Sequence, residues 1–468
     1  MSKTRRNEMI IIGSRIFNEL GNVSADMAVY TSEGVIVEVA PPSTLQETYP
    51  NAKIIDLHGD LLLPGLCDAH IHLEAGGKSL EILNLLGMDN SQIEAAFHRK
   101  KVQHREKEGW FRAFNWEPSR AKITRRMLDK YISNRPAIVH QRDLHGLCCN
   151  SLALELAGIS NLTGDPPGGT IGRNADGSLN GLLYENAIPQ LEAVIPLPSV
   201  DDRKQYILSA QEKLLSLGLT AISEVLEAGA DPIYRELDRT GELKLFVDAW
   251  QRVEHWEIGT PPPPNGNRYQ LHTLKAFLDG SFGSRTAALN EPYVDDKANS
   301  GQLFYNDNEL WDMIKQAQDA GWRMALHAIG DRAIEQACRV MNTVPDRASF
   351  RHRLEHVEML PATLVMPLAE SGLTASVQPV HLLDDQIWLE SCLGTERCRT
   401  VLPLRTISNH KIPLAFGSDF PVVDPDPLLN LHTAINRCGF GDKPLQAFAQ
   451  KECFSPMDAL LASTYGYA

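Results

Sequence analysis

The sequence contains no apolar segment long enough to cross a membrane, and no signal-peptide core. Its first residues, "MSKTRRNEMIIIGSRIFNEL", start with basic side chains, but the apolar run before Gly13 covers only four residues. A signal peptide needs an apolar core of about 7–15 residues, and a membrane helix needs about 20. We therefore expect a cytoplasmic protein that does not insert into a membrane.

The sequence also lacks an excess of positive charge. Lys and Arg number 45 against 59 Asp and Glu, which gives a formal net charge of −14 at pH 7. Surfaces that bind nucleic acids or anionic lipids need clustered basic side chains. We therefore expect neither of these partners and predict a small-molecule substrate, with a homodimer as the default expectation for the assembly.

Paired cysteines are absent as well. The eight cysteines form no C-x-x-C pair and have no regular spacing, which argues against a disulfide framework or a structural zinc site. They are interpreted as reduced thiols, and the adjacent Cys148 and Cys149 as buried packing residues. With 468 residues, 43% hydrophobic and 22% charged, the chain has room for one large α/β domain and a smaller one.

The chain begins with a pattern typical of a small β unit. Residues 8–63 contain the strand-like segments "EMIIIGSRIF", "DMAVYTSEGVIVEVA" and "AKIIDLHGDLLLPG", separated by Gly, Asn and Pro. From residue 205 onward, amphipathic helical segments precede short apolar strands, as in "QYILSAQEKLLSLGL" before "TAISEV" and "LWDMIKQAQDAGW" before "RMALHAI". This alternation predicts a parallel sheet covered by helices, either doubly wound or closed into a (β/α)₈ barrel.

Residues 74 to about 200 do not follow either pattern. Stretches such as "NLTGDPPGGTIGRNADGSLNG" are interpreted as Pro- and Gly-rich loops of an inserted subdomain. Four aromatic residues are candidates for a pocket wall, although such residues more often belong to a core: Trp110, Trp116, Tyr184 and Trp388.

Polar residues close several of the apolar runs. The stretch "PGLCDAHIHLEAGG" places His70 and His72 one residue apart, although with 15 histidines in 468 residues one such pair is unsurprising by chance. Four other runs also end at or near a polar side chain: His327 in "RMALHAIGD", His356 in "RLEHVEM", Gln378 in "TASVQPVH" and Asp419 in "LAFGSDFP". Taken singly, each is more simply a structural hydrogen-bonding residue or turn former. Because the C-terminal strand ends of a barrel converge on one face, the set together predicts a metal site.

Four imidazoles and one carboxylate are suitable ligands for Zn²⁺ or a similar ion. They exceed what one tetrahedral catalytic ion needs, so we expect one or two ions. A second ion would need an anionic bridge, and Lys275 in "TLKAFLDGSFGSRTAAL" could supply it as a carbamate. The simpler alternative for Lys275 is an ion pair or a substrate contact.

Six segments, in this order, resemble the metal-dependent amidohydrolase superfamily, specifically its YtcJ-like branch (amidohydrolase family 3). They are "DAHIHL", "LKAFLDGSFGSRTAAL", "ALHAIGD", "RLEHVEM", "SVQPVH" and "FGSDFPV". The likeness extends from about residue 8 to the end of the chain. It includes "DLHGLCCNSLAL" and "DPPGGTIGRNADGSLNGLLYENA" in the inserted region.

This resemblance implies a fold and a set of ligands. Residues 64–468 would form a (β/α)₈ barrel with an insertion at about 74–200 after its first strand, and residues 1–63 part of a β-sandwich. His70, His72 and Asp419 would bind one metal ion, His327 and His356 would bind the second, and a carboxylated Lys275 would bridge them. The sequence ends at "MDALLASTYGYA", where relatives continue, so the C-terminal sandwich strands are expected to be missing.

The resemblance also implies hydrolysis by a metal-activated hydroxide, with Asp419 as ligand and general base. His145, His381 and Arg285 are candidates for contacts with the substrate or for supporting the ligands, or alternatively are structural hydrogen-bond partners. The predicted reaction is cleavage of an amide-type C–N bond in a small molecule, such as an N-acyl or N-substituted formamide compound. A deaminase, an ester or lactone hydrolase, and a non-catalytic scaffold remain the alternatives.

Overall fold

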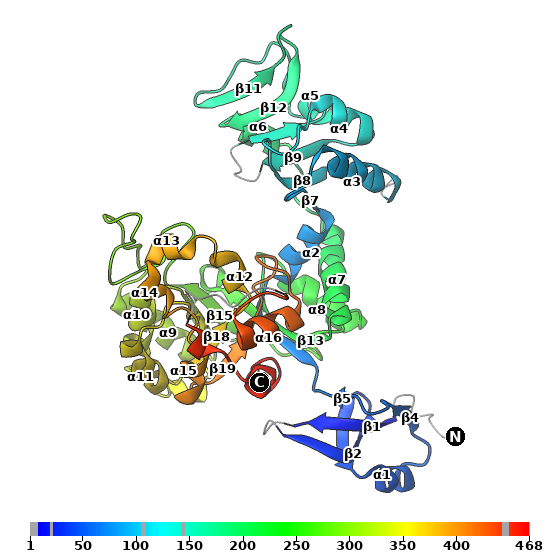
Figure 1. The fold of residues 1–468 in the computed structure, drawn as a ribbon, viewed down its shortest axis with the longest axis vertical. Coiled ribbons are helices and arrows are strands. Elements are labelled where there is room, and N and C mark those ends of the chain that lie inside the picture. Colours follow the sequence, from blue (N-terminus) through cyan, green and yellow to red (C-terminus); the bar gives the residue numbers. More distant parts are fainter. Residues whose placement is uncertain (1–7, 19–21, 104–108, 142–145, 442–448, 468) are drawn as a thin grey trace. The chain divides into compact units, whose positions relative to one another are not determined.

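The computed structural model describes residues 8–18, 22–103, 109–141, 146–441 and 449–467 (Figure 1). The chain divides into two compact units. One consists of Met1–Leu73 together with Gln211–Ala468, and the other is Glu74–Ala210. The first unit contains a small N-terminal sheet and the eight-stranded sheet that carries the predicted site.

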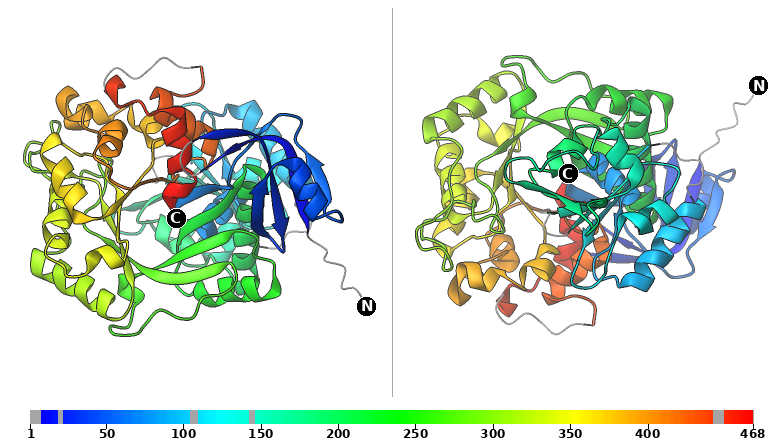
Figure 2. Two further views of the ribbon diagram at one scale, coloured as in Figure 1. Left: turned by 90° about the horizontal axis from the view of Figure 1, so that it is seen from below. Right: turned by 90° about the horizontal axis from the view of Figure 1, so that it is seen from above.

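Eight parallel strands form the main sheet, which confirms the predicted barrel over the doubly wound alternative. In sheet order they are β19 (Leu414–Phe416), β18 (Thr374–Val377), β17 (Arg353–His356), β16 (Arg323–Ala328), β15 (Tyr269–Phe277), β14 (Phe246–Arg252), β13 (Leu219–Val225) and β6 (Leu66–Ile71). Helices surround the strands (Figure 2). They are α8 (Asp231–Thr240), α9 (Asp307–Asp319), α10 (Asp331–Met341), α11 (Ala362–Ser371), α15 (Leu404–Asn409), α16 (Pro427–Asn436) and α17 (Pro456–Ala462), with the short α12 (His381–Asp385), α13 (Leu389–Leu393) and α14 (Thr395–Cys398) after β18.

The sequence pattern explains these elements. Parallel strands are covered on both faces, so they are almost continuously apolar and buried; in β13 only Thr220 is exposed. Helix α10 buries Ala333, Ile334, Ala337 and Met341 on one face, the spacing of an amphipathic helix. Helix α9 begins at a capping box made by Asn306 and Glu309.

The chain after β19 returns to the end of β6 and joins the two edges of the sheet. The backbone N–H of Asp419 donates a hydrogen bond to the carbonyl of His70 at 2.7 Å, and that of His72 donates to Phe420 at 2.8 Å. Gly417 permits this approach, because a Cβ atom there would lie 2.6 Å from the backbone nitrogen of His70. The first and last barrel strands are thereby held together at their C-terminal ends.

The N-terminal sheet has five strands: β3 (Val35–Ala40), β2 (Val23–Ser32), β1 (Met9–Phe17), β4 (Lys53–Asp56) and β5 (Leu61–Leu62). Strand β1 pairs antiparallel with β2 and parallel with β4. The sequence analysis did not predict helix α1 (Pro42–Thr48), which packs Leu45 into a cluster with Ile10 and Tyr30. This helix is seven residues long, too short to show a helical period in the sequence.

The inserted unit has its own sheet, in the order β11 (Gly169–Arg173), β12 (Leu179–Glu185), β10 (Gly146–Cys149), β9 (Ala137–Gln141), β8 (Phe111–Trp116) and β7 (Leu83–Asn84). Its helices are α3 (Asn90–Gln103), α4 (Arg125–Tyr131), α5 (Ser151–Leu156) and α6 (Ile188–Glu192), and the chain enters it through α2 (Leu73–Glu81) and leaves it through α7 (Val200–Ser216). The interpretation of residues 161–181 as loops was wrong in part, because β11 and the start of β12 form an antiparallel hairpin there. Asn174 and Ser178 close its turn with a backbone hydrogen bond of 2.8 Å.

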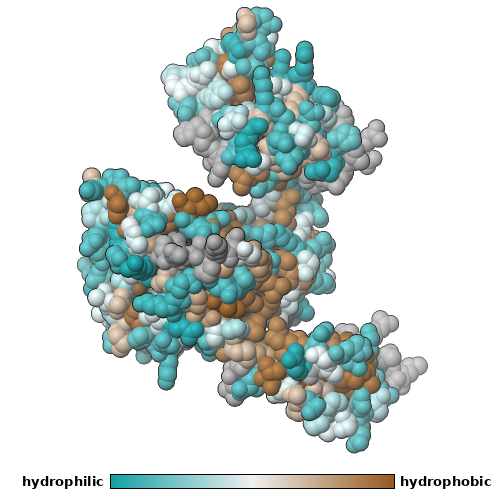
Figure 3. Space-filling model, viewed as in Figure 1, coloured by the Kyte–Doolittle hydropathy of each residue, from teal (hydrophilic) through white to brown (hydrophobic). Residues whose placement is uncertain are grey.

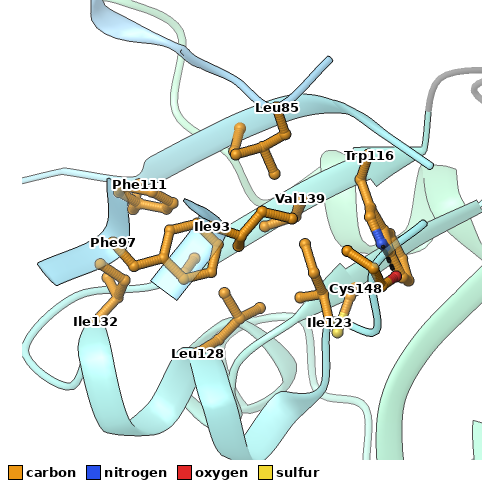
Figure 4. Close-up of a cluster of buried hydrophobic side chains, with 13 residues drawn as sticks. Leu85, Ile93, Phe97, Phe111, Trp116, Ile123, Leu128, Ile132, Val139 and Cys148 are labelled. Atoms are coloured by element: carbon orange, nitrogen blue, oxygen red, sulfur yellow. Dashed lines mark hydrogen bonds between the residues drawn. The ribbon is translucent and has the colours of Figure 1, made fainter. Parts of the chain in front are cut away.

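A hydrophobic core lies under this second sheet (Figure 4). Trp116 is 3% exposed, packs in this core and donates its indole N–H to the carbonyl of Ala121, so it is a core residue and not part of a pocket wall. Cys148 and Cys149 are fully buried, which confirms their interpretation as packing residues. All eight cysteines are free.

Hydrophilic residues cover much of the face shown in Figure 3, and hydrophobic residues gather on part of it. Within the part of the chain that the structure describes, no helix combines the length and apolar character needed to cross a membrane.

The close approach at Gly417 yields a test of barrel closure. We expect Gly417→Ala to lower the free energy of unfolding by about 1–3 kcal/mol, because the added methyl group overpacks the backbone of His70. Gly164→Ala is the matched control, since a Cβ atom there meets nothing within 4 Å. Denaturant unfolding of both variants measures the difference, and equal stability would contradict the role given to Gly417.

Candidate metal centre

The predicted ligands come from the C-terminal ends of five barrel strands. His70 lies in β6 and His72 directly after it, Lys275 lies in β15, His327 in β16 and His356 at the end of β17. Asp419 follows β19 by three residues. Gln378, which the sequence analysis also noted, follows β18 directly.

The structure brings these side chains together. Asp419 Oδ1 lies 3.2 Å from His72 Nε2 and 3.6 Å from His70 Nε2. The ring of His356 has its centroid 4.8 Å from that of His70 and 4.4 Å from that of His327. Ligand atoms of His70, His356 and Asp419 all lie within 4.8 Å of one another, close enough to hold one ion.

Hydrogen bonds orient the imidazole rings. His70 Nδ1 contacts Glu355 Oε2 at 2.7 Å, and His356 Nδ1 contacts Gln378 Oε1 at 2.9 Å. An Nδ1–H that donates to such a partner fixes the tautomer and leaves the Nε2 lone pair for a metal. In His327 the other ring nitrogen makes the hydrogen bond: its Nε2 contacts the carbonyl of Gly280 at 3.1 Å.

The charge states suit metal ligands. Burial lowers the pKa of His70 to about 4 and of His327 to about 3, and it lowers the pKa of His356 well below its ordinary value. Burial alone would raise the pKa of Asp419, but the neighbouring imidazoles hold it well below the ordinary value. Near pH 7 the site therefore combines neutral imidazoles at His70, His327 and His356 with an ionised carboxylate. His72 differs from them: burial acts to lower its pKa, but the contact with Asp419 raises it above the ordinary value.

The sequence analysis missed Glu355, which supports His70. Its carboxylate is fully buried and binds Arg353 Nε at 2.9 Å in addition to His70. Burial acts to raise its pKa, but the charge of Arg353 and the hydrogen bond from His70 lower it to about 2. Arg353 also donates to the carbonyl of Ala69 at 2.6 Å, which ties β17 to β6 across the barrel. The available signal was a pair of charged residues, in "RLEH", inside a strand whose neighbours are apolar.

Three more buried carboxylates hold the backbone around the site, and they too were missed. Asp68 accepts hydrogen bonds from the backbone N–H groups of His70 and Ser418. Asp279 accepts three, from Ala288, Ile329 and Gly330. Glu224 accepts the backbone N–H of Leu73, the residue after His72, and the hydroxyl of Tyr234.

Lys275 is buried without a counter-ion in contact. It is 0% exposed, and its Nζ has no hydrogen-bond partner among the described residues. The ammonium lies 5.8 Å from the ring centroid of Trp250, which in turn packs edge-on against His70. Burial lowers the pKa of Lys275 to about 8. Lys275 therefore forms no ion pair with any described residue, which was one of the two simpler roles considered for it; the other, a substrate contact, stays open.

The remaining candidates lie in different surroundings. His381 is buried, with Nε2 3.1 Å from the carbonyl of Ser418 and Nδ1 3.9 Å from Glu358. Although burial lowers its pKa, Glu358 and Asp419 raise it to about 9. Arg285 binds Asp295 at 2.5 Å and the carbonyl of Phe282, so its guanidinium holds a loop. His145 lies outside the described residues.

Unpartnered buried atoms test whether the cluster fits a cation. Lys275 Nζ, His327 Nδ1 and Asp419 Oδ1 are buried and have no hydrogen-bond partner among the described residues. Each buried polar atom without a partner destabilises the folded state by about 1–3 kcal/mol. An imidazole nitrogen and a carboxylate oxygen, left free next to two further imidazoles, match the donor set of a divalent cation. The residues present therefore fit such an ion.

The Glu355–His70 contact yields a test of this centre. We expect Glu355→Gln to weaken divalent metal binding about 10–100-fold, because the neutral amide no longer fixes the His70 tautomer as strongly. Glu370→Gln, at an exposed position of α11, is the control. Metal titration followed by calorimetry measures both variants, and unchanged affinity in Glu355→Gln would show that the contact does not serve metal binding.

Comparisons with known proteins agree with this architecture. The model of a family described as "Amidohydrolase family" matches residues 53–468. Among curated relatives, YtcJ of Bacillus subtilis (strain 168), whose name assigns it to the amidohydrolases, is 29% identical over 97% of this chain and 89% of its own. The N-substituted formamide deformylase of Arthrobacter pascens is 23% identical over 95% of this chain and 86% of its own.

Solved structures give the same result. An uncharacterized metal-dependent hydrolase from Pyrococcus horikoshii OT3 superposes with a TM-score of 0.80 at 28% identity and covers 99% of this chain and 92% of that one. A second, from Pyrococcus furiosus, has a TM-score of 0.79 at 28% identity, with coverage of 99% and 94%. The chain therefore belongs to the amidohydrolase family.

Proposed function

We propose that the protein is a metal-dependent hydrolase that cleaves an amide-type C–N bond of a small molecule, such as an N-acyl or N-substituted formamide compound. The carrying observation is the cluster of His70, His356 and Asp419 at the C-terminal face of the barrel, whose ligand atoms lie within 4.8 Å of one another, with His72 Nε2 3.2 Å from Asp419 Oδ1. Family membership supports a hydrolase, and the formamide deformylase among the relatives favours an amide. We also propose action in the cytoplasm, without a nucleic-acid partner.

Each residue of the site has a proposed role in metal binding or in proton transfer. His70, His72 and Asp419 would hold one ion, with Zn²⁺ as the proposed metal, and His327 and His356 a second. When bound, such an ion supplies hydroxide at neutral pH and polarises a carbonyl group. Asp419 is ionised near pH 7, so its carboxylate accepts a proton from the attacking water and returns it to the leaving nitrogen. Glu355 and Gln378 keep two imidazoles in their orientation during this transfer.

Turnover of matched substrates tests the proposed reaction. A panel of N-alkylformamides, other N-acyl amines, lactones and aminopurines is incubated with chelated protein and with protein reloaded with Zn²⁺ or Mn²⁺. We expect amide cleavage that chelation abolishes and reloading restores. Lactone or aminopurine turnover without amide turnover would overturn the proposal, and failure to bind stoichiometric metal after reloading would favour a scaffold.

Substitutions of the proposed ligands test where on the protein the reaction takes place. We expect Asp419→Asn to lower kcat about 10²–10⁴-fold through loss of the proton acceptor. The double variant His70→Ala/His72→Ala should lose both metal and activity while circular dichroism still reports a folded barrel. Asp424→Asn is the control, because this exposed carboxylate pairs with Lys213. Full activity in the double variant would contradict the assigned site.

We further propose that Lys275 carries a carbamate that bridges two ions. Its buried Nζ without a hydrogen-bond partner among the described residues supports this, because a carbamate would replace an unpaired buried cation by an anion that could bind the metal ions. Incubation with ¹³C-bicarbonate and metal should give a carbamate resonance in the NMR spectrum. We expect the signal to vanish in Lys275→Met and to persist in the exposed control Lys297→Met. Its absence from the unsubstituted protein would refute the modification.

A further inference from the structure

The inserted unit contains a cavity of about 410 Å³ that is lined entirely by its own residues. One wall is formed by α2 and α7, and the other by residues 109–112 at the start of β8, by Arg135 just before β9 and by residues 195–198. This volume lies in the range of small-molecule sites, about 300–1,000 Å³. The proposed reaction uses none of the residues that line it.

Three cationic side chains line this cavity: Lys78, Arg112 and Arg135. None of them has an ion pair or a side-chain hydrogen bond with another described residue. Arg135 is the most informative of the three, since burial lowers its pKa despite the nearby charge of Glu81. A guanidinium that is partly removed from water and unpaired is unfavourable unless an anion compensates it.

The two carboxylates of the cavity form no ion pair with these cations. Asp202 accepts hydrogen bonds from the backbone N–H and the hydroxyl of Ser199, at 2.9 and 2.7 Å, at the start of α7. Glu81 acts on Arg135 through its charge, which raises the pKa of the guanidinium but does not offset the effect of burial. The cavity therefore has an excess of positive charge, in a protein whose formal net charge is −14.

Aromatic groups form the apolar part of the lining. The guanidinium of Arg135 lies 5.6 Å from the ring centroid of Phe111, and the half-buried Trp110 packs on the core of the same unit. Tyr206 of α7 also contributes to the lining. A planar guanidinium recognises a carboxylate through two parallel hydrogen bonds, and aromatic faces accommodate a flat apolar group.

We propose that this cavity is a binding site for a small organic carboxylate. Its carboxylate group pairs with Arg112 and Arg135, and its apolar body packs against Trp110 and Tyr206. Lys78, at the end of α2, adds a third positive charge at the cavity wall. An inorganic anion would leave the aromatic lining unused, so the site favours an anion with an apolar or aromatic body.

Calorimetric titration with 3-phenylpropanoate tests the proposal on the metal-loaded full-length chain, with the neutral 3-phenylpropanamide as the matched ligand. We expect saturable binding of one carboxylate per chain and at least tenfold weaker binding of the amide. The same binding should persist in His70→Ala/His72→Ala, which excludes the metal centre as the carboxylate site. Arg112→Gln and Arg135→Gln should each weaken binding about tenfold, as expected for loss of a charge-assisted hydrogen bond.

Arg126→Gln is the control, because Arg126 is exposed in the same unit and lies outside the cavity. Lys78→Gln, which changes an accessible helix position, gives a third test if either arginine variant is unstable. Equal binding of acid and amide, loss of binding only in the histidine variant, competition by inorganic phosphate at the same concentration, or no saturable binding would each overturn the proposal.

Discussion

The metal-compatible cluster depends on the contact between the first and the last strand of the barrel. His70 and His72 come from β6, whereas Asp419 comes from the chain after β19, almost 350 residues later. The hydrogen bond from Asp419 N–H to the carbonyl of His70 fixes these two segments against each other. Asp68 reinforces the contact through Ser418, with backbone and hydroxyl hydrogen bonds of 3.0 and 2.5 Å. Without this contact, the two imidazoles and the carboxylate would not be held close to one another.

Two groups of buried charged residues surround this contact. Carboxylates that accept backbone N–H groups, such as Asp68 and Asp279, hold the strand ends in place. Glu355 lies between Arg353 and His70 and so links a buried cation to a prospective ligand. Removing either partner of a buried ion pair lowers the free energy of unfolding by about 3–5 kcal/mol, because the other charge stays uncompensated. The histidines are therefore oriented by groups that the fold itself needs.

The apolar pattern of the strands was sufficient to predict a parallel sheet covered by helices, and the polar residues at the strand ends, with the family resemblance, favoured the barrel over a doubly wound sheet. Glu355 and Glu224 were not predicted, since their partners His70 and Leu73 approach them only after the barrel has closed. Helix α1 was missed because seven residues are too few to show a helical period, and the β11–β12 hairpin because its glycines interrupt the alternation of a strand. Arg285 matched a motif, but its pairing with Asp295 depends on a loop conformation that no spacing encodes.

The attachment of α2 to the barrel has a mechanical consequence. A single residue, His72, separates β6 from α2, so the chain enters the inserted unit directly beside this side chain. The carboxylate of Glu224 accepts a hydrogen bond from the N–H of Leu73 at 2.5 Å and a second one from the hydroxyl of Tyr234 in α8 at 2.9 Å. Strain that arrives along the helix is thus passed to β13 and α8 before it reaches the imidazole. This anchor lets the sequence beyond Leu73 diverge in length and composition while the geometry of His72 stays constant.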